Sequence, residues 1–239
     1  MLGMRHQHRK PSRDEAEKPF WISFSDMMTA LMVLFLVVMT VTLLAVTHTV
    51  SETERVKAAR DAAISALMAR VRLAVEDYPG ITVRGTTIDF GDQARFDTDS
   101  ALLTPGQARH LRAFVPHILA IARDPLGRQW LKRVVVEGYA DQRGTYLHNL
   151  DLSMKRSERV LFALLEEPEP GEKPLSLEDR LLVEQLFLVG GASFTSLKDT
   201  LEESRRIEMK LEFLDTGEAG AETRPVELAR SASGTERRP

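Results

Sequence analysis

The stretch PFWISFSDMMTALMVLFLVVMTVTLLAVTHTV, residues Pro19–Val50, decides the architecture of this chain. The overlapping run Met27–Ser51 contains no Asp, Glu, Lys or Arg. At about 1.5 Å per residue this run is roughly 37 Å long as a helix. The hydrocarbon core of a bilayer is about 30 Å thick, so such a helix crosses it with some tilt. We therefore predict one transmembrane helix over residues 19–50.

A cleaved signal peptide does not fit this stretch. The apolar region of a signal peptide is usually about 7–15 residues long, and this run is longer. The segment Thr47–Val50 also carries no evident small-residue cleavage site. We therefore expect the helix to be retained in the mature protein.

The charges that flank the apolar run predict its orientation. Basic residues precede it at five positions: Arg5, Arg9, Lys10, Arg13 and Lys18. The opposite flank, Ser51–Arg55, has mixed charge. By the positive-inside rule the N-terminus is cytoplasmic and the chain after the helix is exported. We expect a single-pass inner-membrane protein whose residues 1–18 form a cytoplasmic tail and whose C-terminal domain is periplasmic.

One ionisable residue, Asp26, stands at the beginning of the apolar run. A carboxylate costs about 2.5–3.5 kcal/mol at the bilayer centre on insertion scales, and a simple anchor does not need one. Ser25 and Thr29 provide polar neighbours along the same helix. We predict that Asp26, Ser25 and Thr29 line an ion path, with the proton as the expected ion. The alternative is an interfacial Asp26 that extends to the lipid headgroups.

Composition limits what the exported part of the chain does. The formal net charge of −3 argues against a general nucleic-acid binder. The chain has no cysteine, and its six histidines are scattered. No zinc-type spacing and no nucleophile–base pair stand out. We therefore expect no enzyme, no metal site and no cofactor.

Apolar periodicity divides the exported part. Residues 51–78 show helical spacing and predict a periplasmic linker helix, with a movable plug as the alternative. Residues 79–215 predict an α+β domain, a small mixed sheet with helices on one face. The expected strands lie at 81–90 around Gly85, at 133–137 and at 206–214, and the expected helices at 104–122, 149–166 and 176–188. Residues 216–239 are poor in apolar side chains and predict a disordered tail.

Two of these helices have recognisable N-terminal signals. Thr104 is followed by Pro105 and, three residues after the cap position, by Gln107. Ser176 is likewise followed by Asp179. Both patterns are typical of capped helix starts.

Three motifs in this domain resemble those of the OmpA-like peptidoglycan-binding domain. They are GYAD at 138–141, NLDLSMKRS at 149–157 and SRRIE at 204–208. The family patterns are G-H-T-D, N-x-x-L-S-x-x-R-A and N-R-R-V-E. The resemblance covers about residues 81–214. Tyr139 and Ala140 depart from the His and Thr of the family pattern.

The resemblance implies that Asp141 and Arg156 bind the diaminopimelate of a peptidoglycan stem peptide. The chemistry fits, because an Arg fork pairs with a carboxylate and an Asp accepts from an ammonium group. Asn149 lies near a helix N-terminus, where backbone N–H groups also favour an anion. The alternative is a structural Asp141–Arg156 ion pair without ligand, and Arg206 is interpreted as mainly structural.

The membrane helix with Asp26, followed by this domain, resembles the MotB family of stator subunits. Nearly the whole chain, except the tail, more closely resembles the ZorB subunits of Zorya anti-phage defence systems. The residues that carry the closer resemblance are DEAEKPFWIS at 14–23, MVLFLVVM at 32–39, RFD at 95–97 and SRR at 204–206. This resemblance implies a dimer of the chain inside a ring of a larger, MotA-like subunit, ZorA, with ion flow past Asp26. A flagellar-type stator subunit and a passive membrane-to-wall tether remain alternatives.

Overall fold

The computed structural model describes residues 13–168, 171–172 and 174–217. The chain divides into two compact units, Met1–Val56 and Lys57–Pro239. The first helix, α1 (Arg13–Val75), begins inside the segment 1–18 that was predicted as a tail. The rest of that tail, 1–12, and most of the predicted disordered tail, 218–239, lie outside the described residues.

In the first unit, α1 carries the apolar run. Within the described residues it is the one helix that is long and apolar enough to cross a membrane, with a mean hydropathy of 2.7 in its most apolar window. All side chains from Trp21 to Val50 are exposed in the single chain. Threonine hydroxyls in the run donate to the carbonyl four residues earlier, as Thr40 Oγ1 does to Leu36 O at 2.7 Å. These hydroxyls therefore need no water, which suits a lipid environment.

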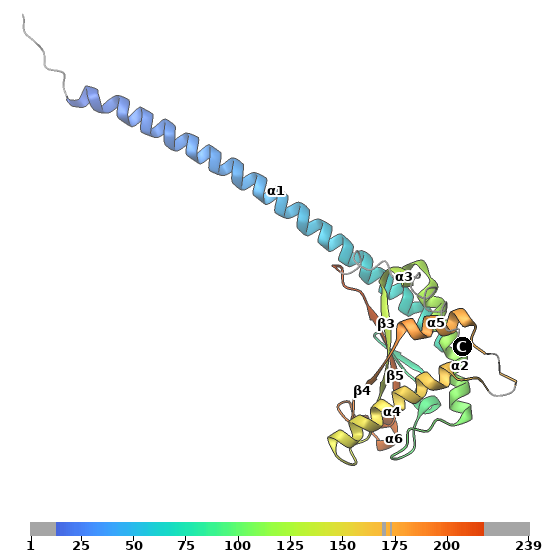
Figure 1. The fold of residues 1–239 in the computed structure, drawn as a ribbon. Helices are drawn as coiled ribbons and strands as arrows, with labels where there is room; N and C mark the ends of the chain where they lie inside the picture. The colour runs from blue at the N-terminus through green and yellow to red at the C-terminus, as the bar shows by residue number, and fades with distance from the viewer. Residues whose placement is uncertain (1–12, 169–170, 173, 218–239) are drawn as a thin grey trace, which may run out of the picture. The chain divides into compact units, whose positions relative to one another are not determined.

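The second unit contains a five-stranded mixed sheet (Figure 1). Its strands are β1 (Thr82–Arg84), β2 (Thr87–Asp89), β3 (Leu131–Gly138), β4 (Phe187–Gly191) and β5 (Ile207–Phe213). The order is β1-β2-β5-β3-β4, with β3 and β4 parallel and the other pairs antiparallel. The alternation in β5 buries its apolar side chains and leaves Lys210 exposed, as predicted for a strand with one buried face.

Helices cover one face of this sheet, which confirms the predicted fold class (Figure 1). The longer ones are α2 (Pro105–Arg123), α4 (Tyr146–Leu165) and α5 (Leu177–Leu186). The short ones are η1 (Gly91–Ala94), α3 (Pro125–Trp130) and α6 (Leu201–Ser204), none of which was predicted.

The predicted capping signals are confirmed. Thr104 Oγ1 accepts from Gln107 N at 3.2 Å, and Gln107 Oε1 accepts from Thr104 N at 2.9 Å. Ser176 and Asp179 form the same reciprocal box at α5. The start of α4 was predicted too late, at Asn149. In the structure Thr145 is the N-cap, and its hydroxyl accepts a hydrogen bond from the backbone N of His148. Asn149 therefore lies within the helix.

Strand β4 was missed by the sequence prediction, which placed a helix over 176–188 and a loop at Gly190. In the structure the helix ends at Leu186 and the chain pairs in parallel with β3, Gly190 opposite Glu137. A short strand with two glycines has little β-propensity of its own. Its conformation comes from pairing with β3, about fifty residues earlier in the sequence.

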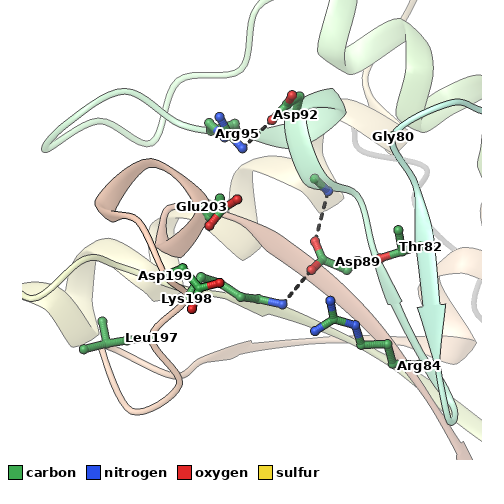
Figure 2. A pocket seen from close by; sticks show the side chains of 11 residues that line it. Gly80, Thr82, Arg84, Asp89, Asp92, Arg95, Leu197, Lys198, Asp199 and Glu203 are labelled. Atoms are coloured by element: carbon green, nitrogen blue, oxygen red, sulfur yellow. Dashed lines mark hydrogen bonds and ion pairs between the residues drawn. The ribbon is translucent and has the colours of Figure 1, made fainter.

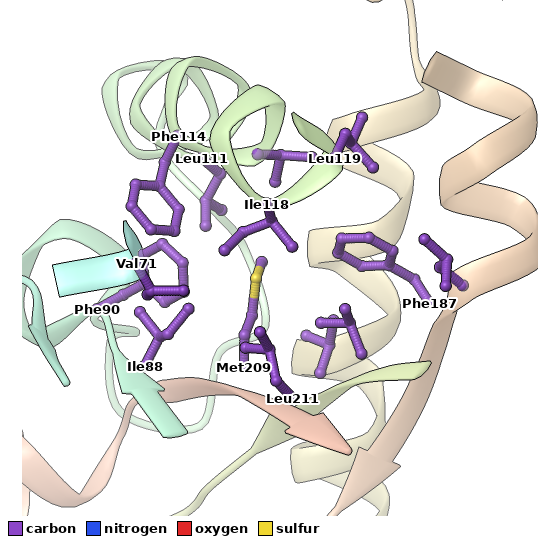
Figure 3. Packing of buried hydrophobic residues seen from close by; sticks show 14 of the residues in the cluster. Val71, Ile88, Phe90, Leu111, Phe114, Ile118, Leu119, Phe187, Met209 and Leu211 are labelled. Carbon is purple, nitrogen blue, oxygen red and sulfur yellow. The ribbon is translucent and has the colours of Figure 1, made fainter. Parts of the chain in front are cut away.

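The core lies between the sheet and the helices. Ile118 of α2 faces Met209 and Leu211 of β5 across it (Figure 3). Leu67 and Val71, from the last part of α1, are fully buried in the same cluster. The compact unit therefore starts at Lys57, whereas the sequence prediction separated a linker at 51–78 from a domain at 79–215.

The sequence prediction missed that the last part of α1 belongs to the domain, because the partners of that part are distant in the sequence. Leu67 and Val71 lie one turn apart on α1, which indicates a helix with one apolar stripe but does not identify what covers it. In the structure the hydrophobic core of the domain packs against this stripe. Arg60 Nε also donates to Leu214 O at 2.6 Å. The end of α1 is thus joined to the end of β5.

We predict that Leu67→Ala lowers the free energy of unfolding by about 2–5 kcal/mol, because it leaves a cavity in the core. The matched control is Leu73→Ala on the same helix, where the side chain is 63% exposed and the expected change is about 0.5 kcal/mol or less. Urea unfolding of the full chain in detergent, followed by Trp130 fluorescence in a Trp21→Phe background, measures both. Equal small effects would show that this part of α1 does not belong to the core.

Candidate functional site

A cavity of about 220 Å³ in the second unit brings together the three predicted ligand-binding residues Asp141, Asn149 and Arg156. Asp141 follows the end of β3, and the other two lie on the first half of α4. The loop between η1 and α2 closes the cavity with Thr98 and Asp99. The sheet edge, the start of α4 and this loop therefore form one site.

The Arg156 side chain is fully buried at the cavity and is held by three backbone carbonyls. Its Nε donates to Ser100 O at 2.9 Å, Nη1 to Tyr139 O at 2.7 Å and Nη2 to Asp97 O at 3.0 Å. The guanidinium carbon also lies 5.1 Å from the centre of the Phe96 ring. These three bonds use three of the five guanidinium N–H groups, and the other two make no hydrogen bond within the described residues.

Arg156 keeps its charge in this environment. Burial lowers the pKa of its guanidinium to about 10, and the charge of Arg205 acts in the same direction. The carboxylates of Asp141 and Asp99 oppose this change. At neutral pH the cavity therefore contains a buried cation, which favours a carboxylate ligand.

Asp141 is ionised as well. Its Oδ1 accepts from the backbone N of Arg143 at 2.9 Å, and its Oδ2 accepts from Arg205 Nη1 at 3.1 Å. Burial raises the pKa of this carboxyl, but the hydrogen bonds and charges of Arg143 and Arg205 outweigh burial, so the pKa lies below its ordinary value. Asp141 therefore forms ion pairs with Arg205 and Arg143. The structural alternative, an ion pair between Asp141 and Arg156, is wrong.

Arg205 was missed by the sequence analysis. It is buried, and its Nε also donates to Phe96 O at 2.9 Å. The signal was present in the SRR motif at 204–206, where only Arg206 was given a role. Two adjacent arginines point to opposite sides of an extended chain, so sequence alone could not tell which one reaches Asp141.

Tyr139, which replaces the His of the family pattern, packs beside the cavity. The Tyr139 hydroxyl donates to Glu137 Oε2 at 2.7 Å, and the Arg206 guanidinium lies 3.9 Å from the ring centre. Arg206 also pairs with Glu208 at 2.6 Å, in keeping with its structural interpretation. Tyr139 contributes its backbone carbonyl to Arg156, and its ring does not line the cavity.

Asn149 positions the turn that precedes α4. Its Nδ2 donates to Arg143 O at 2.8 Å. Gly144 in this turn has a φ of +96°, a conformation that other residues rarely adopt. The turn therefore holds Arg143 and Asp141 beside the start of the helix.

The predicted ion-path residues lie in the first unit. Asp26 is exposed in the single chain. Thr29 Oγ1 donates to Ser25 O at 2.8 Å, so its oxygen keeps lone pairs for a further donor. Ser25 and Thr29 are thus one helical turn apart and both are near neighbours of Asp26 along α1.

A second cavity, of about 530 Å³, contains none of the predicted residues (Figure 2). Four of its charged side chains form two ion pairs within the wall. Lys198 Nζ lies 3.0 Å from Asp89 Oδ2, and Arg95 pairs with Asp92. The first cavity, with a buried and only partly used guanidinium, is the better ligand site.

Several known proteins are similar to parts of this chain. Residues 4–48 match the family model described as membrane MotB of the proton-channel complex MotA/MotB. Among solved structures, the OmpA-like domain of FopA1 from Francisella tularensis is 20% identical over 56% of this chain and 82% of that one, with a TM-score of 0.35. The periplasmic domain of Helicobacter pylori MotB is 13% identical over 64% and 87%, with a TM-score of 0.38. This chain therefore has an N-terminal segment that is similar in sequence to membrane MotB.

Its family follows from a closer relative. The Zorya protein ZorB of Escherichia coli O139:H28 (strain E24377A / ETEC) is 40% identical over 216 residues, 89% of this chain and 88% of that protein. The chain belongs to the ZorB family.

We predict that Arg156→Ala lowers the free energy of unfolding by about 3 kcal/mol or more, because three buried carbonyls lose a charged donor. Arg156→Lys should recover part of this loss, since an ammonium group cannot reach all three. The control is Lys155→Ala, at an exposed neighbour, which should leave unfolding nearly unchanged. An unchanged free energy of unfolding in Arg156→Ala would contradict the structural role of these bonds.

Proposed function

We propose that this chain is the ion-conducting, peptidoglycan-anchored subunit of a ZorA–ZorB type membrane complex in anti-phage defence. The observation that carries the proposal is Asp26, an ionisable residue in an otherwise uncharged and fully exposed helical run. A carboxylate facing lipid is costly, so intramembrane acids almost always face other helices or a water-filled path. The family membership of the chain supports the same role.

The proposed partner is a MotA-like, multi-helix subunit, ZorA, that forms a ring around a dimer of this chain. Such a ring covers the exposed apolar side chains of the run and shields Asp26 from lipid. Proton binding and release at Asp26, with Ser25 and Thr29 as polar neighbours, then couples ion flow to movement of the ring. The proposed role is not enzymatic.

The proposed orientation places the N-terminus in the cytoplasm and the second unit in the periplasm, because basic residues dominate the first flank. There the cavity binds the diaminopimelate of a stem peptide. The two N–H groups that remain on Arg156 bind its carboxylate, and Asp141 accepts from its ammonium group. Attachment to the wall keeps the subunit from turning with the ring.

We predict that Asp26→Asn abolishes phage protection in cells that carry the complete operon. The amide keeps the size and polarity of the side chain but cannot exchange a proton, and the helix should insert at least as well. Protection is measured by plaque counts, with membrane levels and copurification of the partner checked in parallel.

The matched control for this experiment is Glu52→Gln, which removes a carboxylate from the same helix outside the apolar run and should leave protection intact. Full protection by Asp26→Asn would favour the passive tether. Loss of motility, in place of phage sensitivity, would favour a flagellar-type stator.

We also predict that the full chain in detergent binds peptidoglycan whose stem peptides carry diaminopimelate about tenfold more tightly than peptidoglycan with lysine at that position. Lysine lacks the second carboxylate, so the buried Arg156 has no anion to bind. Pull-down with both wall types measures the ratio, and equal binding would contradict the proposed site.

A further inference from the structure

His48 stands near the C-terminal end of the apolar run that Asp26 begins. Between Pro19 and Ser51 these two are the titratable side chains, since the stretch carries no Lys, Arg, Glu, Tyr or Cys. Imidazole exchanges a proton close to neutral pH more readily than any other unperturbed side chain. Ionisable residues inside membrane helices are rare and often mark proton pathways. The run therefore contains two groups that can carry a proton.

The two groups lie on the same side of α1. The helix is continuous from Asp26 to His48, and both side chains are exposed in the single chain. At about 3.6 residues per turn, the step from residue 26 to residue 48 is about six turns and leaves His48 rotated by about 40°. The same step advances about 33 Å along the axis, close to the hydrocarbon thickness of about 30 Å. Each group therefore lies at one boundary of the apolar run.

Two hydroxyls lie between them, within about 60° of Asp26 around the axis. Thr40 Oγ1 and Thr47 Oγ1 donate to carbonyls four residues earlier, at 2.7 and 2.8 Å. Each oxygen keeps lone pairs that can accept from water. Thr42 and Thr49 make the same kind of bond but lie about 140° or more from Asp26. The hydroxyls alone therefore do not select a face, and the two titratable groups do.

The imidazole of His48 is available to water. Ser51 Oγ donates to the backbone carbonyl of His48 at 3.0 Å, and within the described residues the ring itself makes no hydrogen bond. The nearest charged side chains lie beyond the run, Glu52 one turn further on and Arg55 two turns further on. Because these two have opposite charges, their effects on a protonated imidazole oppose each other.

We infer that His48 is the proton-accepting residue at the end of the ion path opposite Asp26. Its neutral imidazole takes a proton from water at the membrane surface, which is the periplasmic surface in the proposed orientation. The imidazolium then releases a proton inward to water on the way to Asp26 and returns to its neutral form. The inference rests on the proposed ion conduction, in which the partner ring encloses this face of α1.

The test uses an isosteric pair of variants at residue 48 in cells that carry the complete operon. His48→Gln keeps a polar side chain but cannot exchange a proton, and should lower phage protection by about tenfold or more. His48→Glu is titratable and should retain at least about threefold more protection than His48→Gln. Plaque counts measure protection, and a pH-sensitive fluorescent protein follows cytoplasmic acidification after infection, which should fall in parallel. Membrane levels and copurification of the partner should stay unchanged.

Moving the imidazole tests its position on the helix. In the His48→Gln background, Ser51→His places a ring about 20° from Asp26 around the axis and should restore protection and acidification. Thr49→His is the matched control, because it places the same ring about 140° away and should restore neither. A residue with only a structural role would be satisfied by Gln and would show no such dependence on the face.

Unchanged protection in His48→Gln, with protection lost in Asp26→Asn, would overturn the inference and leave the proposed function in place. Equal loss in His48→Gln and His48→Glu, or equal restoration by Ser51→His and Thr49→His, would also overturn it. Wild-type protection without acidification would overturn the proton-accepting role. A wild-type chain that gives no protection would overturn the proposed defence function itself.

Discussion

The hydrogen bonds of the buried Arg156 guanidinium are the interaction on which the site depends. They hold Asp97 and Ser100 of one loop and Tyr139 after β3, segments that are far apart in the sequence. A buried charge is tolerated only when it is well satisfied, so these carbonyls must stay in place. The loop that carries Asp99 is thereby fixed against the start of α4. Stability of the domain and shape of the cavity consequently depend on the same side chain.

Each unit contains a charged side chain whose position is costly unless partners satisfy the charge. Asp26 stands at the beginning of an uncharged helical run, and Arg156 lies in the interior of the domain. The protein satisfies Arg156 with three of its own backbone carbonyls, and the proposed function uses the remaining N–H groups for a ligand. Asp26 is exposed in the single chain, and in the proposed complex other subunits supply its environment. The proposed function follows from this contrast, because one charge fits an anchor and the other an ion path.

Elements with local signals were predicted well. The box of Thr104 and Gln107 lies within four residues, and the alternation of β5 within seven, so both patterns are complete in the sequence. The cavity residues Asp141, Asn149 and Arg156 came from the resemblance of three motifs to the OmpA-like domain. The start of α4 was placed too late because a Thr cap is a weaker signal than a full capping box.

The sequence by itself determined the apolar run with Asp26 and the fold class, since both depend on residue type and short spacing. Its resemblance to the OmpA-like domain implied three residues of the cavity. Only the tertiary structure decided that Leu67 belongs to the core, that 187–191 is a strand, that Arg205 pairs with Asp141, and that Asp99 meets His148. All four depend on partners dozens of residues away. A hydrophobic stripe or a charge shows that some partner is needed, and the folded chain selects which one by packing and hydrogen-bond geometry.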